Sequence, residues 1–385
     1  MADHSLIEWT DATWNPITGC SVVSPGCTNC YAMKLAGTRL KHIPSRAGLT
    51  RDSKAGPVWT GEVRLNEQWL DQPLRWKAPR RIFVCAHGDL FAENVPDHWI
   101  DRVFAVMALA PQHTFQVLTK RSRRMRDYVN GFTCDGARRF SIANAAGRMM
   151  ADGDNAHDWV ANAAWPLSNI WLGTSVEDQQ RADLRIPDLL ATPAAVHFAS
   201  AEPLLGRIDF RRILVEHPVY AGVSAYQDAL VGQLFDLGTS PIGDTNKLDW
   251  IIVGGESGRG ARPMHPEWVR SLHDQCDAAG TAFFFKQWGE WAPICFMSED
   301  QTDACYDPAP ARYPEAIRRC KVDKCVLHTD GERFELDAWS RQARHDSRRM
   351  FEAGLNGMTM YSIGKKAAGR LLYGVEHNAM PEMRP

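Results

Sequence analysis

The stretch Trp250-Ile251-Ile252-Val253-Gly254 is a continuous apolar run, and Thr281-Ala282-Phe283-Phe284-Phe285 is a second one a short distance along the chain. Unbroken apolar runs of this length are typical of strands buried on both faces of a sheet. The residues between them include a helical pattern that begins at Pro266 and stops at Gly280. A strand, a helix and a second strand in this order predict a parallel sheet.

The same pattern recurs towards the N-terminus. Four further apolar runs lie at 82–86, 114–119, 170–174 and 196–199, and a helical pattern occupies 97–110. Six to eight strand–helix units of this kind predict an α/β fold, a full or partial TIM-like (β/α) barrel of parallel strands. We expect residues 1–288 to form this barrel, with an insertion near 211–247. We expect residues 289–385 to form a loop-rich, cysteine-containing extension whose C-terminal helical segment packs on the barrel.

Composition narrows the class of protein. Among 385 residues, 44 are basic and 46 are acidic, so the net charge of −2 argues against a generally cationic nucleic-acid binder. The apolar fraction of 44% is sufficient for a substantial core. The sequence contains no apolar run of the ~20 residues that cross a bilayer. It starts with Met1-Ala2-Asp3-His4-Ser5, which does not resemble a signal peptide. We therefore expect a cytoplasmic protein without a membrane partner.

Ten cysteines are too few for a disulfide scaffold in a chain of this length. Three of them, Cys20, Cys27 and Cys30, fall within eleven residues with the spacing C-x6-C-x2-C. Three thiolates on one loop can hold three irons of a [4Fe–4S] cluster, which leaves the fourth iron open to S-adenosylmethionine (SAM). A structural zinc site is the alternative, with Cys85 or a histidine as the fourth ligand.

Polar residues follow each apolar run. They include Asp89, Lys120, Ser175, Glu177, Glu202, Glu256 and the sequence Lys286-Gln287-Trp288. In parallel α/β folds the C-terminal ends of the strands surround the active site. We therefore expect these side chains to converge on one mouth, although a strand that simply ends in a polar turn would leave the same pattern.

The segments Asn15-Pro16-Ile17-Thr18-Gly19-Cys20 and Gly26-Cys27-Thr28-Asn29-Cys30-Tyr31-Ala32 resemble the cluster loop of radical-SAM proteins related to spore photoproduct lyase. The usual radical-SAM spacing, C-x3-C-x2-C, has three residues fewer between the first two cysteines. The longer spacing resembles that of a phage-associated family, the Gp thirty-seven/Gp sixty-eight family. This likeness extends over most of the chain, through 7–16, 115–121, 171–178, 201–206, 253–258, 284–289 and 365–370.

The resemblance implies a function and a set of site residues. Cys20, Cys27 and Cys30 would bind the cluster, and an electron donor such as a flavodoxin or ferredoxin would reduce it. SAM would then be cleaved to a 5′-deoxyadenosyl radical; aminocarboxypropyl transfer from SAM is the alternative reaction. Gly254-Gly255-Glu256 matches the motif that holds the SAM amino group in such proteins, although here it follows a late strand. The residues expected to contact SAM are Tyr31, Asp89, Lys120, Ser175, Glu177, Glu202, Gly254, Gly255 and Glu256.

Basic runs indicate one class of substrate. Lys120-Arg121-Ser122-Arg123-Arg124-Met125-Arg126 follows a strand, and Arg341, Arg344, Arg348 and Arg349 recur at helical spacing. Local patches of this kind can bind phosphates on a nearly neutral protein, and Trp288 and Trp291 could stack a base. Nucleic acid is therefore an expected substrate of the enzyme, with a flipped-out base as its target. It is also the ligand of a non-catalytic alternative, a zinc or nucleic-acid-binding protein. The residues expected to contact substrate are Arg121, Arg124, Lys286, Gln287 and Trp288.

Four more cysteines, Cys295, Cys305, Cys320 and Cys325, fall late in the chain without a C-x2-C pair. Four thiols are enough for a second cluster or a zinc ion. Free thiols in a loop-rich region are the alternative.

Overall fold

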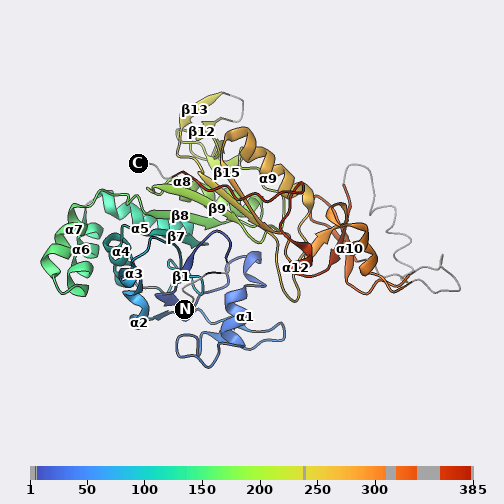
Figure 1. The fold of residues 1–385 in the computed structure, drawn as a ribbon. Coiled ribbons are helices and arrows are strands. Elements are labelled where there is room, and N and C mark those ends of the chain that lie inside the picture. Colours follow the sequence, from blue (N-terminus) through green and yellow to red (C-terminus); the bar gives the residue numbers. More distant parts are fainter. Residues whose placement is uncertain are drawn as a thin grey trace.

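A computed structural model describes residues 5, 7–134, 136–236, 240–308, 318–335 and 356–382. Its centre is a seven-stranded sheet in the order β1-β6-β7-β8-β9-β14-β15, in which every neighbouring pair is parallel. The sheet curls, but among the described residues no pairing joins β15 to β1, and the sheet therefore forms a half-barrel (Figure 1). The prediction of a partial TIM-like barrel is confirmed. The strands are β1 (Ala12–Trp14), β6 (Arg81–Val84), β7 (Thr114–Thr119), β8 (Ile170–Ser175), β9 (Val196–Ala201), β14 (Trp250–Gly254) and β15 (Ala282–Gln287).

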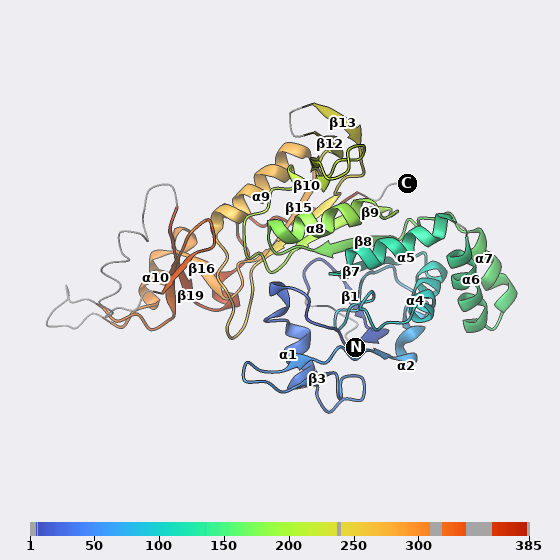
Figure 2. The ribbon, with the colours of Figure 1, turned by 180° about the vertical axis from the view of Figure 1, so that it is seen from behind.

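The central strands are apolar throughout because both of their faces are covered. Every residue of β8, β9 and β14 is buried. The helices α8 and α9 cover one face of the sheet, and the N-terminal segment that carries α1 lies on the opposite side (Figure 2). The helices are α1 (Tyr31–Gly37), α2 (Glu67–Leu70), α3 (Gln72–Arg75), α4 (Asp97–Leu109), α5 (Ser122–Cys134), α6 (Ala137–Met149), α7 (Gly153–Asn162), α8 (Gln179–Leu190), α9 (Pro266–Ala279), α10 (Glu299–Ala304) and α12 (Lys365–Ala368).

Local sequence signals set the limits of α9. Pro266 stands at its first position, where a missing N–H is harmless. The His265 ring accepts a hydrogen bond from the Glu267 amide at 3.1 Å. Gly280 ends the helix at φ +68°, a left-handed conformation that glycine adopts without strain. No described helix has both the length and the apolar character needed to cross a membrane.

The inner face of the half-barrel is filled at its base by aromatic rings. Trp250 of β14 lies at the centre, with ring centroids 6.0 Å from Trp9, 6.1 Å from Trp171 and 5.7 Å from Phe198. The Trp250 indole N–H also donates to the Ala379 carbonyl at 2.9 Å, so the end of the chain crosses this base. Because the base is packed, the described residues leave an open site towards the C-terminal ends of the strands.

Two antiparallel sheets lie outside the half-barrel. The segment expected to be an insertion without clear periodicity contains β10 (Ile213–Glu216), β11 (Ser224–Asp228), β12 (Gln233–Phe235) and β13 (Pro241–Asp244). The extension contains β16 (Trp291–Pro293), β17 (Lys324–Leu327), β18 (Arg333–Glu335) and β19 (Met358–Ser362), and therefore more regular structure than the sequence indicated. Arg341, Arg344, Arg348 and Arg349 of the expected C-terminal helical segment lie outside the described residues.

The remaining elements are short. Two strand pairs, β2 with β5 and β3 with β4, flank the N-terminal segment. The 3-10 turn η1 (Pro25–Cys27) lies between the first two cysteines of the motif and ends at the second, and η2 (Ile294–Phe296) follows β16. The strands of the two pairs are β2 (Ile17–Thr18), β5 (Arg64–Leu65), β3 (Thr50–Arg51) and β4 (Val58–Trp59).

Candidate metal and cofactor site

A cavity of about 410 Å³ opens at the C-terminal ends of the strands. Residues 20–30, which we call the cysteine loop, and the start of α1 form one wall of it, and the strand ends form the other. Thirteen of the seventeen residues that the sequence predicted for the site line this cavity; Arg124, Glu177, Gly254 and Trp288 do not. Those that line it are Cys20, Cys27, Cys30, Tyr31, Asp89, Lys120, Arg121, Ser175, Glu202, Gly255, Glu256, Lys286 and Gln287.

The cysteine loop is attached to the sheet at three points, and the first is Arg121. This side chain, which follows β7, is 8% exposed. Its Nη1 lies 3.3 Å from Cys20 Sγ, and its Nη2 donates to the Ser21 carbonyl at 3.0 Å. Asp89 Oδ2 accepts from Nη1 at 3.1 Å, and Glu93 Oε1 accepts from Nε at 3.0 Å. Arg121 is therefore a buried clamp on the loop, which differs from the expected role of a substrate contact.

Glu177, which follows β8, makes the second attachment. Its Oε1 accepts from the Gly26 amide at 3.2 Å, and its Oε2 accepts from Arg185 of α8 at 2.9 Å. Burial acts to raise the pKa of Glu177, but the positive charges of Lys120 and Arg185 outweigh it, so the pKa is lowered. The side chain is fully buried, and an expected SAM contact is thus an anchor for the loop. A Cβ on Gly26 would stand 3.1 Å from the Glu177 carboxyl carbon, so this close approach favours glycine.

Glu256, which follows β14, makes the third attachment. Its Oε2 accepts from Asn29 Nδ2 at 2.9 Å, and its Oε1 accepts from Arg262 Nη2 at 2.6 Å. The same Nη2 donates to the Pro25 carbonyl at 3.0 Å. These hydrogen bonds and the charge of Arg262 lower the pKa of Glu256 against the effect of burial. Glu256 therefore supports the loop with a carboxylate whose two oxygens both accept hydrogen bonds from protein groups.

The two glycines before Glu256 are explained by close packing. A Cβ on Gly255 would stand 1.9 Å from the Trp288 carbonyl oxygen, and one on Gly254 would stand 2.6 Å from Glu202 Oε1. At Gly255 the backbone of Trp288 passes too close for any larger residue, whereas at Gly254 a larger residue would require the Glu202 carboxylate to shift. The Gly-Gly-Glu motif in this chain thus serves the docking of the cysteine loop and the packing of β14 against β15.

Burial changes the pKa values of two of the three cysteine thiols. Burial raises the pKa of Cys20 to about 12, Asp89 adds to this effect and Arg121 opposes it. Burial also raises the pKa of Cys30. Without a metal these two thiols are protonated at neutral pH, and a metal must displace their protons when it binds.

The number of sulfur ligands distinguishes two kinds of metal centre. Within the described part of the chain, His328, Asp330 and Glu332 alone form a group of three ligand-type side chains whose donor atoms all lie within 4.8 Å of one another. As a set, the three sulfurs of the cysteine loop are therefore spaced more widely. A single tetrahedral zinc with Zn–S bonds of about 2.3 Å needs sulfurs roughly 3.8 Å apart. A [4Fe–4S] cluster binds each thiolate to a different iron and can leave one iron without a protein ligand, so three cysteines suffice for it, whereas a structural zinc ion requires a fourth ligand.

The charged residues at the base of the cavity are not all neutralised. Lys286 Nζ lies 3.0 Å from Glu202 Oε1 and forms an ion pair with it. The backbone N–H of Lys120 donates to Asp89 Oδ2 at 3.1 Å, but its ammonium group has no hydrogen-bond or ion-pair partner among the residues that the structure describes. The charge of this group acts on Glu177 and Cys30. Tyr31 is half-exposed, and its hydroxyl donates to the Ala86 carbonyl at 2.6 Å. The cavity therefore offers one available ammonium group and an aromatic ring beside the three thiols.

Two expected substrate contacts lie away from the cavity. Trp288 is 2% exposed, and its indole donates to the Leu371 carbonyl at 2.9 Å. Arg124 donates to the carbonyls of Ala92 and Val95 and lies 3.3 Å from Asp97. Neither side chain is in the cavity lining: Arg124 packs onto the segment before α4, and Trp288 is buried beside Leu371.

The late cysteines do not come together. Cys295 is exposed beside Arg270, with Nη2 4.0 Å from its sulfur, whereas Cys325 is buried in the main core. Cys305 and Cys320 lie close enough for their charges to interact. The expected four-cysteine metal site is not formed among the described residues.

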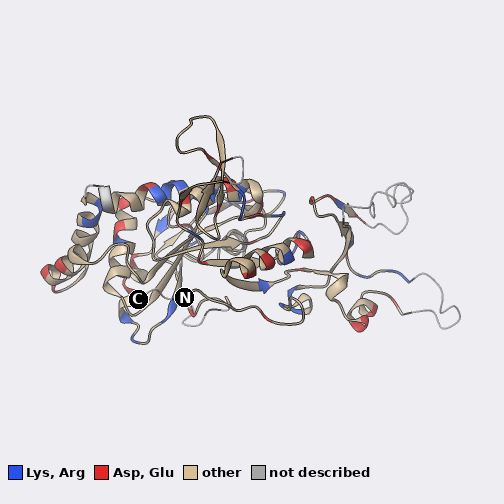
Figure 3. Ribbon diagram, turned by 90° about the horizontal axis from the view of Figure 1, so that it is seen from above, with Lys and Arg blue, Asp and Glu red and all other residues tan. Residues whose placement is uncertain are grey.

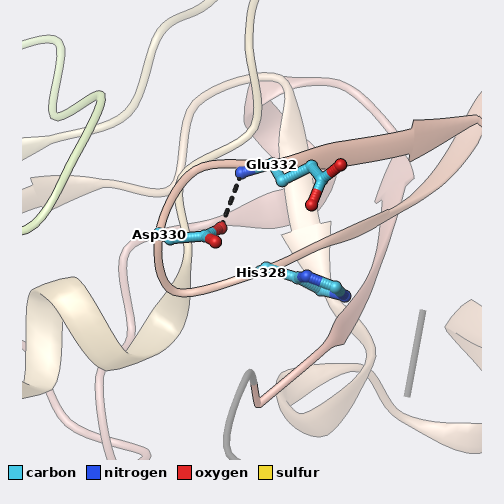
Figure 4. A group of neighbouring side chains, drawn as sticks. All are labelled: His328, Asp330 and Glu332. Carbon is cyan, nitrogen blue, oxygen red and sulfur yellow. Dashed lines mark hydrogen bonds between the residues drawn. The ribbon is translucent and has the colours of Figure 1, made fainter. Parts of the chain in front are cut away.

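The group His328, Asp330 and Glu332 occupies the turn between β17 and β18, as Figure 4 shows. Asp330 Oδ1 accepts from the Glu332 amide at 2.9 Å, so this carboxylate stabilises the turn. The His328 ring packs against Phe334 at a centroid distance of 4.8 Å. We describe the group as the turn of a hairpin and assign no ion to it.

Reasoning from sequence missed the partners that hold the site. Glu93, Asn29, Arg185 and Arg262 each complete one of the three attachments described above. Asn29 carried a local signal, because it lies inside the cysteine motif. Arg185 lies eight residues after Glu177 and had no signal apart from the helix that begins between them.

Together these features define a partial (β/α) barrel with a thiol-rich cavity at its C-terminal mouth. The chain belongs to the family described as "Protein of unknown function (DUF5131)", whose model matches residues 4–381. No curated protein and no solved structure matches it.

Proposed function

We propose that the protein is a radical-SAM-type iron–sulfur enzyme. One observation carries this proposal: three cysteines on a single loop line a cavity at the C-terminal mouth of a parallel half-barrel. The mouth is the place where barrel enzymes assemble their active sites. The three attachments through Arg121, Glu177 and Glu256 keep the loop over this mouth.

The donor set supports an iron–sulfur cluster. Three cysteines leave one iron of a [4Fe–4S] cluster without a protein ligand, whereas a structural zinc ion would need a fourth ligand beside them. A cluster in this position, with SAM on its open iron, would supply the electron that cleaves the sulfonium bond. The chain would contribute the cavity that holds the reacting groups in place.

The remaining cavity residues suit the polar groups of SAM. Lys120 would bind the carboxylate, because its ammonium group has no other partner among the described residues. The ring of Tyr31 would pack beside the adenine or the cluster, held in place by its hydrogen bond to Ala86. Glu202, Ser175 and Lys286 lie at the strand ends below the loop and would contact the ribose and amino groups.

The proposal does not extend to nucleic acid as the substrate. Arg121 and Arg124 are both engaged with protein groups, and Trp288 and Trp291 are buried. Figure 3 shows basic and acidic residues interspersed along the outer helices. These four residues, which suggested a nucleic-acid partner in the sequence, therefore give no support for one in the structure.

The test is anaerobic reconstitution with iron and sulfide, followed by ultraviolet–visible and electron-paramagnetic-resonance (EPR) spectroscopy. We expect a [4Fe–4S] signal that changes when SAM is added, and 5′-deoxyadenosine when dithionite replaces the natural electron donor. Cys27→Ala should abolish both, whereas Cys295→Ala, which alters an exposed thiol outside the cavity, should change neither. Stoichiometric zinc without a cluster would contradict the proposal. Methylthioadenosine as the product would instead identify aminocarboxypropyl transfer.

A further inference from the structure

The three cysteines of the loop have different hydrogen-bond partners. Cys20 Sγ lies 3.3 Å from Nη1 of the guanidinium of Arg121. The sulfur of Cys27 lies 3.8 Å from the Ser24 hydroxyl, and the sulfur of Cys30 is approached by the backbone amides of Ala32 and Met33. Within the described part of the chain, Cys20 is thus the cysteine of the loop that a charged donor contacts.

The guanidinium of Arg121 is held rigidly in this position. Asp89 Oδ2 and Glu93 Oε1 accept from it at 3.1 and 3.0 Å, and the Ser21 carbonyl accepts at 3.0 Å. Asp89 is fixed in turn, because it accepts from Thr119 Oγ1 at 2.7 Å. A planar guanidinium held at several donors keeps each of them aimed at one acceptor. The direction of the N–H that points at Cys20 is therefore determined by these protein contacts and does not depend on a bound metal.

Two acidic partners also offset the positive charge of Arg121, so its effect on the sulfur is mainly that of a directed hydrogen bond. A donor to a ligand sulfur withdraws electron density from it and stabilises the reduced form of a cluster. We propose that Arg121 positions Cys20 and raises the reduction potential of the cluster through this N–H···S hydrogen bond. The inference rests on the proposed function, since it requires a cluster on the three cysteines.

The first experiment is an EPR-monitored redox titration of the reconstituted wild type, Arg121→Gln and Arg121→Lys. At the wild-type midpoint potential we expect Arg121→Gln to lower the ratio of reduced to oxidised cluster about tenfold, or about 59 mV for one electron. Arg121→Lys keeps the charge but loses the planar fork, so its shift should be smaller. Arg123→Gln is the matched control, because it removes a positive charge from an exposed position of α5, two residues after Arg121.

The second experiment needs no variant and stays informative if Arg121→Gln does not fold. Wild-type protein labelled with ¹⁵N-arginine should show a ¹⁵N coupling to the reduced cluster in pulsed EPR. Equal potentials in the wild type and Arg121→Gln, or no ¹⁵N coupling, would overturn the inference and leave the proposed enzyme intact. Failure of the wild type to bind any cluster would overturn both.

Discussion

The carboxylate of Glu177, at the end of β8, accepts a hydrogen bond at 3.2 Å from the backbone amide of Gly26, which lies 151 positions earlier in the chain. The same carboxylate pairs with Arg185 of α8 at 2.9 Å. One buried side chain thus joins the cysteine loop, a central strand and an outer helix. Any cluster on the loop would be oriented by the sheet through this contact.

Glu177→Gln should destabilise both the fold and the loop. The change leaves Arg185 buried without its counter-charge, and removal of one member of a buried pair costs about 3 kcal/mol of unfolding free energy. Urea unfolding measures this loss, and iron content after reconstitution measures the effect on the loop. Glu62→Gln, at an exposed position, is the control. Unchanged stability of Glu177→Gln would show that the pair contributes little.

Gly255→Ala should also destabilise the protein, by about 2 kcal/mol, because a methyl group would meet the Trp288 carbonyl at 1.9 Å. Thermal unfolding checks the expectation. Gly243→Ala in β13 is the matched control, since a Cβ there meets nothing within 4 Å. Equal melting temperatures for the two variants would mean that β14 and β15 separate more easily than their packing indicates.

Lys120→Met should weaken the binding of SAM to the reconstituted protein about tenfold, a loss of about 1.4 kcal/mol. Lys120 lines the cavity and its ammonium group has no partner among the described residues, so the substitution removes a positive charge that the ligand could use without breaking an ion pair. Isothermal titration calorimetry under anaerobic conditions provides the measurement. Lys366→Met, at an exposed position outside the cavity lining, should leave the affinity unchanged. An affinity of Lys120→Met equal to wild type would place the SAM carboxylate elsewhere.

The stability of the protein should fall as the pH drops from about 6.5 to about 4, and His87 should contribute to this fall. Burial, aided by the charge of Arg46, lowers the pKa of His87 from 6.5 to about 4. Above pH 6.5 the ring is neutral in both states and contributes nothing. Below pH 6.5 this ring takes up a proton in the unfolded chain but stays neutral in the folded protein. Its contribution lowers the free energy of unfolding by up to about 3 kcal/mol at pH 4.

Denaturant unfolding between pH 7 and pH 4 measures this effect. His87→Gln should show a shallower loss of stability with acid than the wild type, whereas His42→Gln, at an exposed position, should follow the wild type. Parallel curves for His87→Gln and the wild type would show that other groups carry the acid sensitivity. His113, His265 and His377, whose pKa values are also lowered by burial, contribute to the part that remains, as do carboxylates with lowered pKa values such as Glu177 and Glu256.

The sequence alone predicted six of the seven strands of the central sheet and their parallel direction, but not β1. Residues 250–254 and 281–285 are apolar without a break because both faces of the sheet are covered, and this pattern is local. The helix Pro266–Ala279 was predicted to the residue, since a proline and a glycine mark its two ends. The gathering of polar side chains at one mouth followed from the parallel direction of the strands.

The role of each side chain within the mouth was decided by the tertiary structure. Glu177, Glu256 and Arg121 follow strand ends as Glu202 and Lys286 do, yet the first three hold the cysteine loop and the last two pair within the cavity. Their partners lie 151, 227 and 101 positions away, and residue type and spacing do not encode such contacts. The sequence by itself indicated a full or partial parallel barrel and a three-cysteine loop, and the folded chain showed that the barrel is a half-barrel. Only the folded chain decided which charged side chains hold that loop and which, like that of Lys120, remain available to a ligand.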